Sequence, residues 1–102
     1  LAANPEVTAV RCGNDDLAIG VMRAMHEAGR AIPQDVSIAG FGDIPAAEFM
    51  IPALTTVRQD FARLGRASFA TLLRLLDPGV PEPARWPEAE LIIRDSTWRA
   101  PR

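Results

Sequence analysis

The first half of the chain alternates two short apolar runs with one amphipathic segment. Residues 7–12 and 36–41 are almost continuously apolar, and residues 16–28 between them carry apolar side chains at helical spacing. A strand, a crossover helix and a second strand predict a parallel pair buried on both faces. The fold class expected is therefore α/β, with a parallel sheet flanked by helices.

The helix expected over residues 16–28 has one apolar face. Ile19 lies outside this face, among polar residues. Gly29 is placed to end the helix in a left-handed conformation. Asn14 and Asp15 lie at the start of the helix, where an amide or carboxylate oxygen can cap an unpaired N–H group and where a negative charge interacts favourably with the helix dipole. The face comprises Leu17, Ala18, Val21, Met22, Ala24, Met25 and Ala28.

The second half predicts a helical turn at 46–50, a short β segment at 54–57, a long helix at 60–76, a strand at 91–94 and a polar tail at 95–102. Gly65 falls on the apolar face of the long helix and suggests close approach of another element. The apolar face of this helix comprises Phe61, Leu64, Ser68, Leu72, Leu75 and Leu76.

The composition limits the classes of function. A length of 102 residues fits one modest domain. The net charge is −2 and the eleven basic residues are scattered, so the chain itself has no nucleic-acid footprint. Cys12 cannot form an internal disulfide, which fits a reducing compartment. With no spanning or leader segment recognised, we expect a cytoplasmic protein, no membrane contact, and a chain that is a piece of something longer.

No group of residues indicates enzymatic chemistry. His26 has no second His or Cys at metal-ligand spacing, so no metal is expected. Ser37, Ser68 and Ser96 have no neighbouring base. The sequence G-F-G-D at residues 40–43 lacks the third glycine of a phosphate-binding loop. We therefore expect neither a cofactor nor catalysis.

Polar residues follow each of the first two strands, at the sheet edge where α/β proteins bind ligands. Asn14 follows the first strand and fits either a helix cap or a ligand contact, and the two roles are compatible. Asp43 follows the second and fits either a loop hydrogen bond or a ligand contact. Arg11 ends the first strand, either exposed to solvent or directed at the pocket.

Four motifs in this order resemble the C-terminal portion of the LacI/GalR family of bacterial transcription regulators: G-N-D-D-L-A-I-G, G-F-G-D-I-P, P-A-L-T-T-V-R-Q-D-F-A-R-L-G and L-I-I-R-D-S-T. The resemblance covers essentially the whole chain. It implies a periplasmic-binding-protein-like (type I) fold with two lobes around a cleft, of which this chain is an incomplete fragment. It also implies an N-terminal helix-turn-helix headpiece, so that operator DNA is bound only through a part that this sequence lacks.

The resemblance implies a division into three parts. Residues 1–57 would form the distal half of the C-terminal effector-binding lobe. Residues 58–78 would form a crossover helix that packs on the N-terminal lobe. Residues 79–102 would supply a loop, the last strand and the tail.

The same resemblance assigns ligand contacts. Asn14 matches a position that holds ligand hydroxyls, Phe61 matches a ring that lines the cleft, and Gln59 lies beside it. Gly42 departs from the family pattern, which often has an aspartate there, although Asp43 keeps the second acid. Arg11 together with the missing carboxylate leads to the hypothesis of a sugar acid or sugar phosphate as effector rather than a neutral sugar.

An apolar group beyond the needs of one lobe is interpreted as a homodimer interface, because family members pair through this lobe to read two-fold symmetric operators. Ordinary loop packing is the alternative. The group comprises Ile19, Ile44, Phe49, Met50 and Ile51.

The function expected is therefore effector sensing and dimerisation within a LacI-type regulator, a repressor by this interpretation. A periplasmic sugar-binding protein shares the lobe architecture and is the first alternative. An α/β enzyme fragment is the second, although no acid, base or nucleophile supports it.

Overall fold

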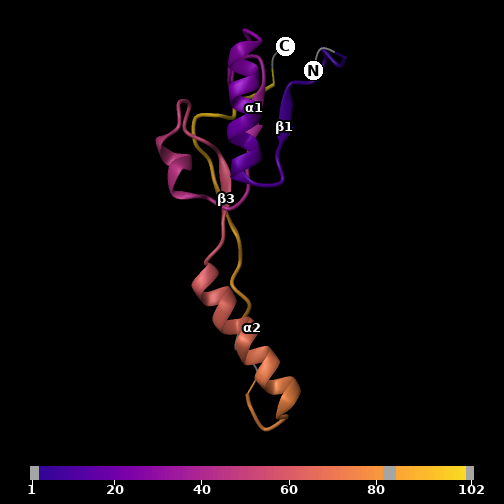
Figure 1. Ribbon diagram of the computed structural model, residues 1–102, viewed down its shortest axis with the longest axis vertical. Helices are drawn as coiled ribbons and strands as arrows, with labels where there is room; N and C mark the ends of the chain where they lie inside the picture. Colours follow the sequence, from indigo (N-terminus) through magenta and orange to yellow (C-terminus); the bar gives the residue numbers. More distant parts are fainter. Residues whose placement is uncertain (1–2, 82–84, 101–102) are drawn as a thin grey trace. The chain divides into compact units, whose positions relative to one another are not determined.

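The computed structural model describes residues 3–81 and 85–100 (Figure 1). The chain divides into two compact units, Leu1–Arg58 with Leu91–Arg102, and Gln59–Glu90. The elements in chain order are β1 (Ala9–Arg11), α1 (Asp15–Glu27), β2 (Ser37–Ala39), the 3-10 helix η1 (Pro45–Phe49), β3 (Thr56–Arg58), α2 (Phe61–Leu76) and β4 (Glu90–Ile92), and β4 pairs with β3.

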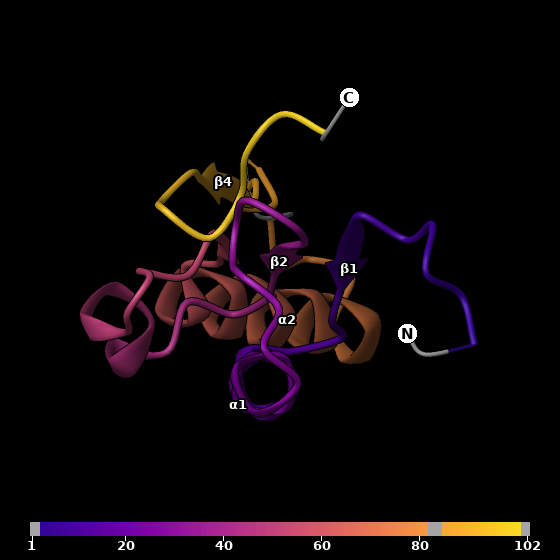
Figure 2. The same cartoon turned by 90° about the horizontal axis from the view of Figure 1, so that it is seen from above.

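Strands β1 and β2 pair in parallel, as the strand–helix–strand pattern predicts. Val10 lies opposite Ile38, and Arg11 lies opposite Ala39. Helix α1 lies against one face of this pair. Figure 2 shows this arrangement with α1 viewed nearly along its axis. The α/β fold with a parallel sheet is thus confirmed.

Burial of these strands on both faces is not observed. Ala9 and Arg11 are exposed, and Ser37 and Ala39 are half-buried. Side chains alternate between the two faces of a strand, so those directed away from α1 lack the layer that would cover them. In the described part of the first unit, the core is therefore one-sided.

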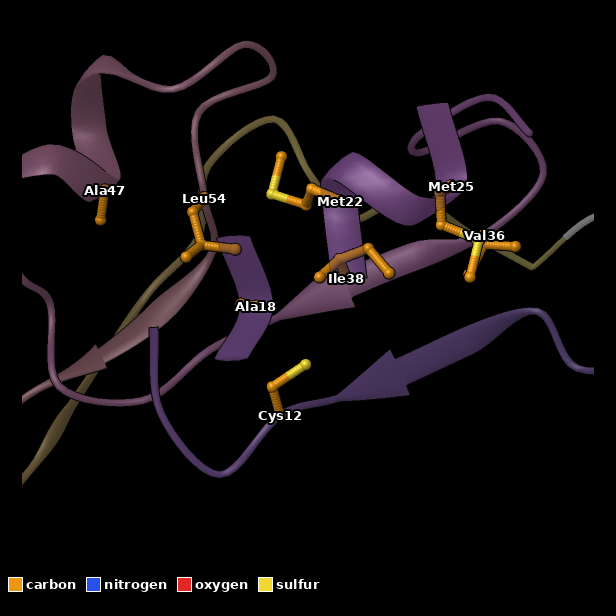
Figure 3. Packing of buried hydrophobic residues seen from close by; sticks show 8 residues of the cluster. All are labelled: Cys12, Ala18, Met22, Met25, Val36, Ile38, Ala47 and Leu54. Atoms are coloured by element: carbon orange, nitrogen blue, oxygen red, sulfur yellow. The ribbon is translucent and has the colours of Figure 1, made fainter. Parts of the chain in front are cut away.

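The core of the first unit forms between α1 and the face of β2 that it covers. Ala18, Val36, Ile38 and Leu54 are fully buried. Figure 3 shows Met22 and Leu54 on the same side of β2 as Ile38. The core cluster comprises Cys12, Ala18, Met22, Met25, Val36, Ile38, Ala47 and Leu54.

Helix α1 begins and ends as its sequence predicts, but its first turn is oriented differently. Asn14 caps the helix, and Gly29 has the expected positive φ of 72°. Leu17, which we placed on the core face, is 59% exposed, whereas Asp15 is fully buried. Asp15 takes the inward position because its carboxylate finds hydrogen-bond donors there, a partnership that apolar periodicity does not encode.

Residues 95–100 form no further helix or strand and are mostly exposed, as the predicted polar tail requires, with Ser96 as the exception. Ser96 is fully buried, and its carbonyl accepts a hydrogen bond of 2.9 Å from the N–H of Ile38. The Ser37 hydroxyl also bonds the backbone of Trp98. Ser96 and Trp98 therefore anchor this segment to β2 through hydrogen bonds, without forming a strand.

Helix α2, capped by Asp60, belongs to the second unit and leaves its apolar face exposed. Phe61, Leu72 and Leu75 are all more than half exposed. A Cβ added to Gly65 would meet no atom within 4 Å, so the close approach predicted there is not found among the described residues. The packing of this helix on an N-terminal lobe remains a prediction.

Candidate functional site

The carboxyl ends of β1 and β2 lie side by side. The Cys12 N–H donates to the carbonyl of Ala39 at 2.8 Å, and the Asp15 N–H donates to the carbonyl of Phe41 at 3.1 Å. The predicted adjacency of the two strand ends is confirmed. The two loops that follow them carry Asn14 and the Gly42–Asp43 pair, so these polar positions share one edge of the sheet.

Asn14 is exposed at this edge and caps α1. Its Oδ1 accepts a hydrogen bond of 2.8 Å from the N–H of Leu17. An amide also carries an NH₂ group with two donors, and the cap does not use it. Asn14 can therefore cap the helix and donate to a ligand at the same time.

Asp15 connects three segments behind the edge. Its Oδ1 accepts from the Thr56 hydroxyl at 2.6 Å, and its Oδ2 accepts from the N–H of Ile44 at 2.8 Å. The sequence predicts a first-turn acid that complements the helix dipole at Asp15, and this prediction leaves out the buried hydrogen bonds. The Thr pair in P-A-L-T-T-V-R was the available signal, because a threonine hydroxyl in a buried strand requires a partner.

Asp43 occupies the turn after β2 with a positive φ of 54°. Its Oδ2 accepts from Arg58 Nε at 2.7 Å, and its Oδ1 accepts from Arg94 Nη1 at 2.8 Å. Burial alone raises the pKa of this carboxyl, but the hydrogen bonds and charges of Arg94 and Arg58 outweigh burial and hold the pKa below its usual value. The sequence alone did not identify either arginine partner.

Two further candidate ligand residues, Gly42 and Arg11, lie at the same edge of the sheet. Gly42 has a φ of 121°, a conformation in which an aspartate would be strained. Its N–H donates to the carbonyl of Val57 at 2.8 Å. Arg11 is exposed at the end of β1. The edge therefore has no carboxylate at position 42 and has an arginine near the end of the neighbouring strand.

Gln59 and Phe61 belong to the second unit. Gln59 is half-buried, and Phe61 is 60% exposed at the start of α2. Asp60 lies between them and accepts a hydrogen bond of 3.0 Å from the N–H of Arg63. This cap fixes the beginning of α2 at Phe61, so Gln59 lies just before the helix and Phe61 is its first residue.

The candidate dimer residues fall into two groups. Phe49 is 77% exposed and Ile51 is 97% exposed. Ile44 and Met50 are half-buried against the core cluster, and Ile19 is also half-buried. A shallow cavity of about 220 Å³, bordered by Met22, His26 and Ile51 among others, lies next to the exposed group.

The remaining titratable and reactive groups form no further site in the described residues. Burial raises the pKa of the Cys12 thiol. Residues 3–81 and 85–100 contain no group of three His, Cys, Asp or Glu side chains able to hold a metal ion.

None of the helices described in residues 3–81 and 85–100 is both long and apolar enough to cross a lipid bilayer.

Comparison with known proteins gives the family. Residues 1–97 match the periplasmic binding protein-like domain. The chain is 38% identical over 96 residues to the HTH-type transcriptional regulator AscG of Escherichia coli K12, covering 94% of this chain and 29% of AscG. Two crystal structures are also similar, each with a TM-score of 0.77.

The first of these structures is a sugar-binding transcriptional regulator of the LacI family from Escherichia coli complexed with phosphate, 39% identical, covering 92% of this chain and 34% of that one. The second is the lac repressor dimer bound to operator and the anti-inducer ONPF, 36% identical, covering 88% of this chain and 32% of that one.

The chain therefore belongs to the family of periplasmic binding protein-like domains, and its relatives place it among the LacI/GalR regulators. It spans less than a third of the length of AscG. These relatives are transcription regulators rather than enzymes, and they do not favour the alternative of a periplasmic transport protein.

Proposed function

We propose that this chain is the effector-sensing and dimerisation part of a cytoplasmic LacI-type repressor, which binds its operator through an N-terminal headpiece. Effector binding would shift the regulator between two arrangements, and it can do so only by binding one of them more tightly than the other. The observation that carries the proposal is the adjacency of the β1 and β2 ends, which brings Asn14 and the Gly42 turn to one edge.

The proposed effector contacts of the first unit are Asn14, Gly42 and Arg11. Gln59 and Phe61 of the second unit are proposed on the family resemblance. Gly42 supplies no carboxylate, and both carboxylate oxygens of Asp43 already accept from arginines. An edge that offers an amide and a guanidinium suits a ligand rich in acceptors. We therefore propose a sugar acid or a sugar phosphate as effector in preference to a neutral sugar.

Calorimetry on the full-length protein tests this proposal. Gluconate and glucose 6-phosphate should bind more tightly than glucose and ribose, and the tighter ligands should change the affinity for an operator selected from genomic DNA. Tighter binding of the neutral sugars would contradict the acidic effector. Failure of all four compounds to alter operator affinity would count against a sugar-type effector altogether.

Variants of Asn14 separate ligand binding from capping. Asn14→Asp keeps an oxygen that caps the helix about as well but removes the amide donors, whereas Asn14→Ala also costs about 1 kcal/mol of stability. Both variants should lower effector affinity at least about tenfold, and only Asn14→Ala should lower the melting temperature. Normal effector binding by Asn14→Asp would assign Asn14 to capping alone.

A further inference from the structure

The carboxylate of Asp43 contacts both segments through which the chain passes between its two units. The first unit ends its first stretch at Arg58 and resumes at Leu91. Arg58 is therefore the last residue before the outgoing crossing, and Arg94 is the fourth residue after the return. One carboxylate oxygen accepts from each of these arginines, at 2.7 and 2.8 Å.

The loop that carries Asp43 is fixed relative to these partners. The backbone N–H of Asp43 donates to the Thr56 hydroxyl at 3.3 Å. The Asp43 side chain is only 10% exposed. Arg94 is 13% exposed, and its Nη1 also donates to the carbonyl of Leu54 at 2.9 Å. The Arg58 side chain is 52% exposed, so the pair of Asp43 with Arg94 is the more buried of the two, and loss of either member of that pair is costly.

The two crossing segments are also joined directly. The Arg94 N–H donates to the Thr55 hydroxyl, and the Thr55 N–H donates to the Ser96 hydroxyl at 2.8 Å. The turn after β2 has its own link to Thr56, through the backbone of Asp43. The Asp43 side chain extends from that turn and contacts both crossing segments, at Arg58 and at Arg94.

We propose that Asp43 is a positioning residue rather than an effector contact, and that it couples the strand-end turn to both crossings between the units. This inference rests on the proposed effector site, because Gly42 precedes Asp43 in that turn. An effector that displaces the turn shifts Asp43 and with it both arginines. The ion-pair cluster of Asp43, Arg58 and Arg94 thereby links effector binding to the relative arrangement of the lobes.

Hydrogen exchange on the full-length protein tests the coupling without any effector. Asp43→Asn should accelerate amide exchange at least about tenfold at both 56–58 and 91–95, because local opening follows the loss of stabilising contacts. Arg94→Gln should reproduce this change. Asp16→Asn and Arg66→Gln remove exposed charges outside the cluster and should leave both segments unchanged. Acceleration at one segment only, or at neither, overturns the proposal.

Effector titrations distinguish positioning from contact. Gluconate, glucose 6-phosphate, glucose and ribose serve as probes. Asp43→Asn should bind the effective probe within about threefold of wild type, yet the ratio of operator affinities without and with that probe should fall at least about tenfold. A loss of probe binding of about a hundredfold, confined to Asp43→Asn and absent from Arg94→Gln, would identify a direct contact and overturn the proposal.

The two proposals can fail separately. If none of the probes binds the wild-type protein while exchange accelerates at both segments, the proposed sugar-type effector is wrong and the coupling by Asp43 stands. If a probe binds and releases operator normally in Asp43→Asn, the sensor function stands and the coupling is wrong.

Discussion

Asp15 accepts a hydrogen bond of 2.6 Å from the hydroxyl of Thr56, 41 residues further along the chain. Both residues are completely buried. The second oxygen of Asp15 accepts from the N–H of Ile44, so one carboxylate joins the start of α1, the turn before η1 and the start of β3. These are the segments that shape the candidate effector edge.

Asp15→Asn should destabilise the full-length protein by about 1–3 kcal/mol, because an amide has one acceptor oxygen for the two donors, of which the Thr56 hydroxyl is buried. Asp15→Ala should cost more, since both donors lose their acceptor. Urea unfolding measures the change. Asp16→Asn, on the exposed side of the same turn, should change stability by no more than about 0.5 kcal/mol. Equal effects at both positions would contradict the role assigned to Asp15.

Gly40 is required by the same contact. A Cβ at this position would overlap Oδ1 of Asp15 and lie 3.1 Å from Cδ2 of Leu54. Gly40→Ala should therefore destabilise by about 1–3 kcal/mol through overpacking. Gly20→Ala provides the control, since its Cβ would meet nothing within 4 Å inside α1. That helical substitution should stabilise by about 0.5–1 kcal/mol. Similar thermal shifts of the same sign would refute this explanation.

The sequence predicts elements from local chemistry, and these predictions hold. Asn14 and Gly29 fix the two ends of α1 through capping and a positive φ. The parallel pairing of β1 with β2 follows from the helix between them. The helix ends depend on residues that are close in the chain, and the pairing depends on the order of elements along it.

Contacts between distant segments could not be predicted in this way. The buried position of Ser96 depends on Thr55 and Ile38, which are 41 and 58 residues away. The two arginines of Asp43 are likewise separated from it in sequence. The periodicity of apolar residues predicts which face of a helix or strand is buried, but it does not identify which polar side chains meet when two elements pack together.

The ion pairs of Asp43 predict a pH dependence. Because the folded protein holds the pKa of Asp43 below the ordinary value of 3.8, its contribution to stability is present above that value. The contribution is lost as the pH falls through the folded-state pKa. The stability gap between wild type and Asp43→Asn should thus be large near neutral pH and shrink in acid.

Unfolding of both proteins at a series of pH values measures this gap. Arg94→Gln serves as the comparison, because removal of that partner should reduce the same acid-sensitive contribution. A gap that stays constant from neutral to acidic pH would show that the carboxylate charge does not stabilise the fold.

The proposed dimer interface is best tested at Ile51. Met50 is half-buried against the core, so a charge there would disturb folding as well as association, whereas Ile51 is 97% exposed. If Ile51 is buried against a second copy, Ile51→Glu places an unpaired charge in an apolar interface at a cost of about 2 kcal/mol or more. The dimer dissociation constant should then rise at least about thirtyfold.

Light scattering after size-exclusion chromatography of the full-length protein, over a dilution series, detects this shift toward monomers. Ile51→Val retains an apolar side chain at the same position and should remain dimeric, and unchanged hydrogen exchange in α1 would show that Ile51→Glu leaves the fold intact. If Ile51→Glu dimerises as tightly as Ile51→Val, the exposed apolar group at Phe49 and Ile51 is not the interface, because no close apolar contact tolerates a buried carboxylate without a partner.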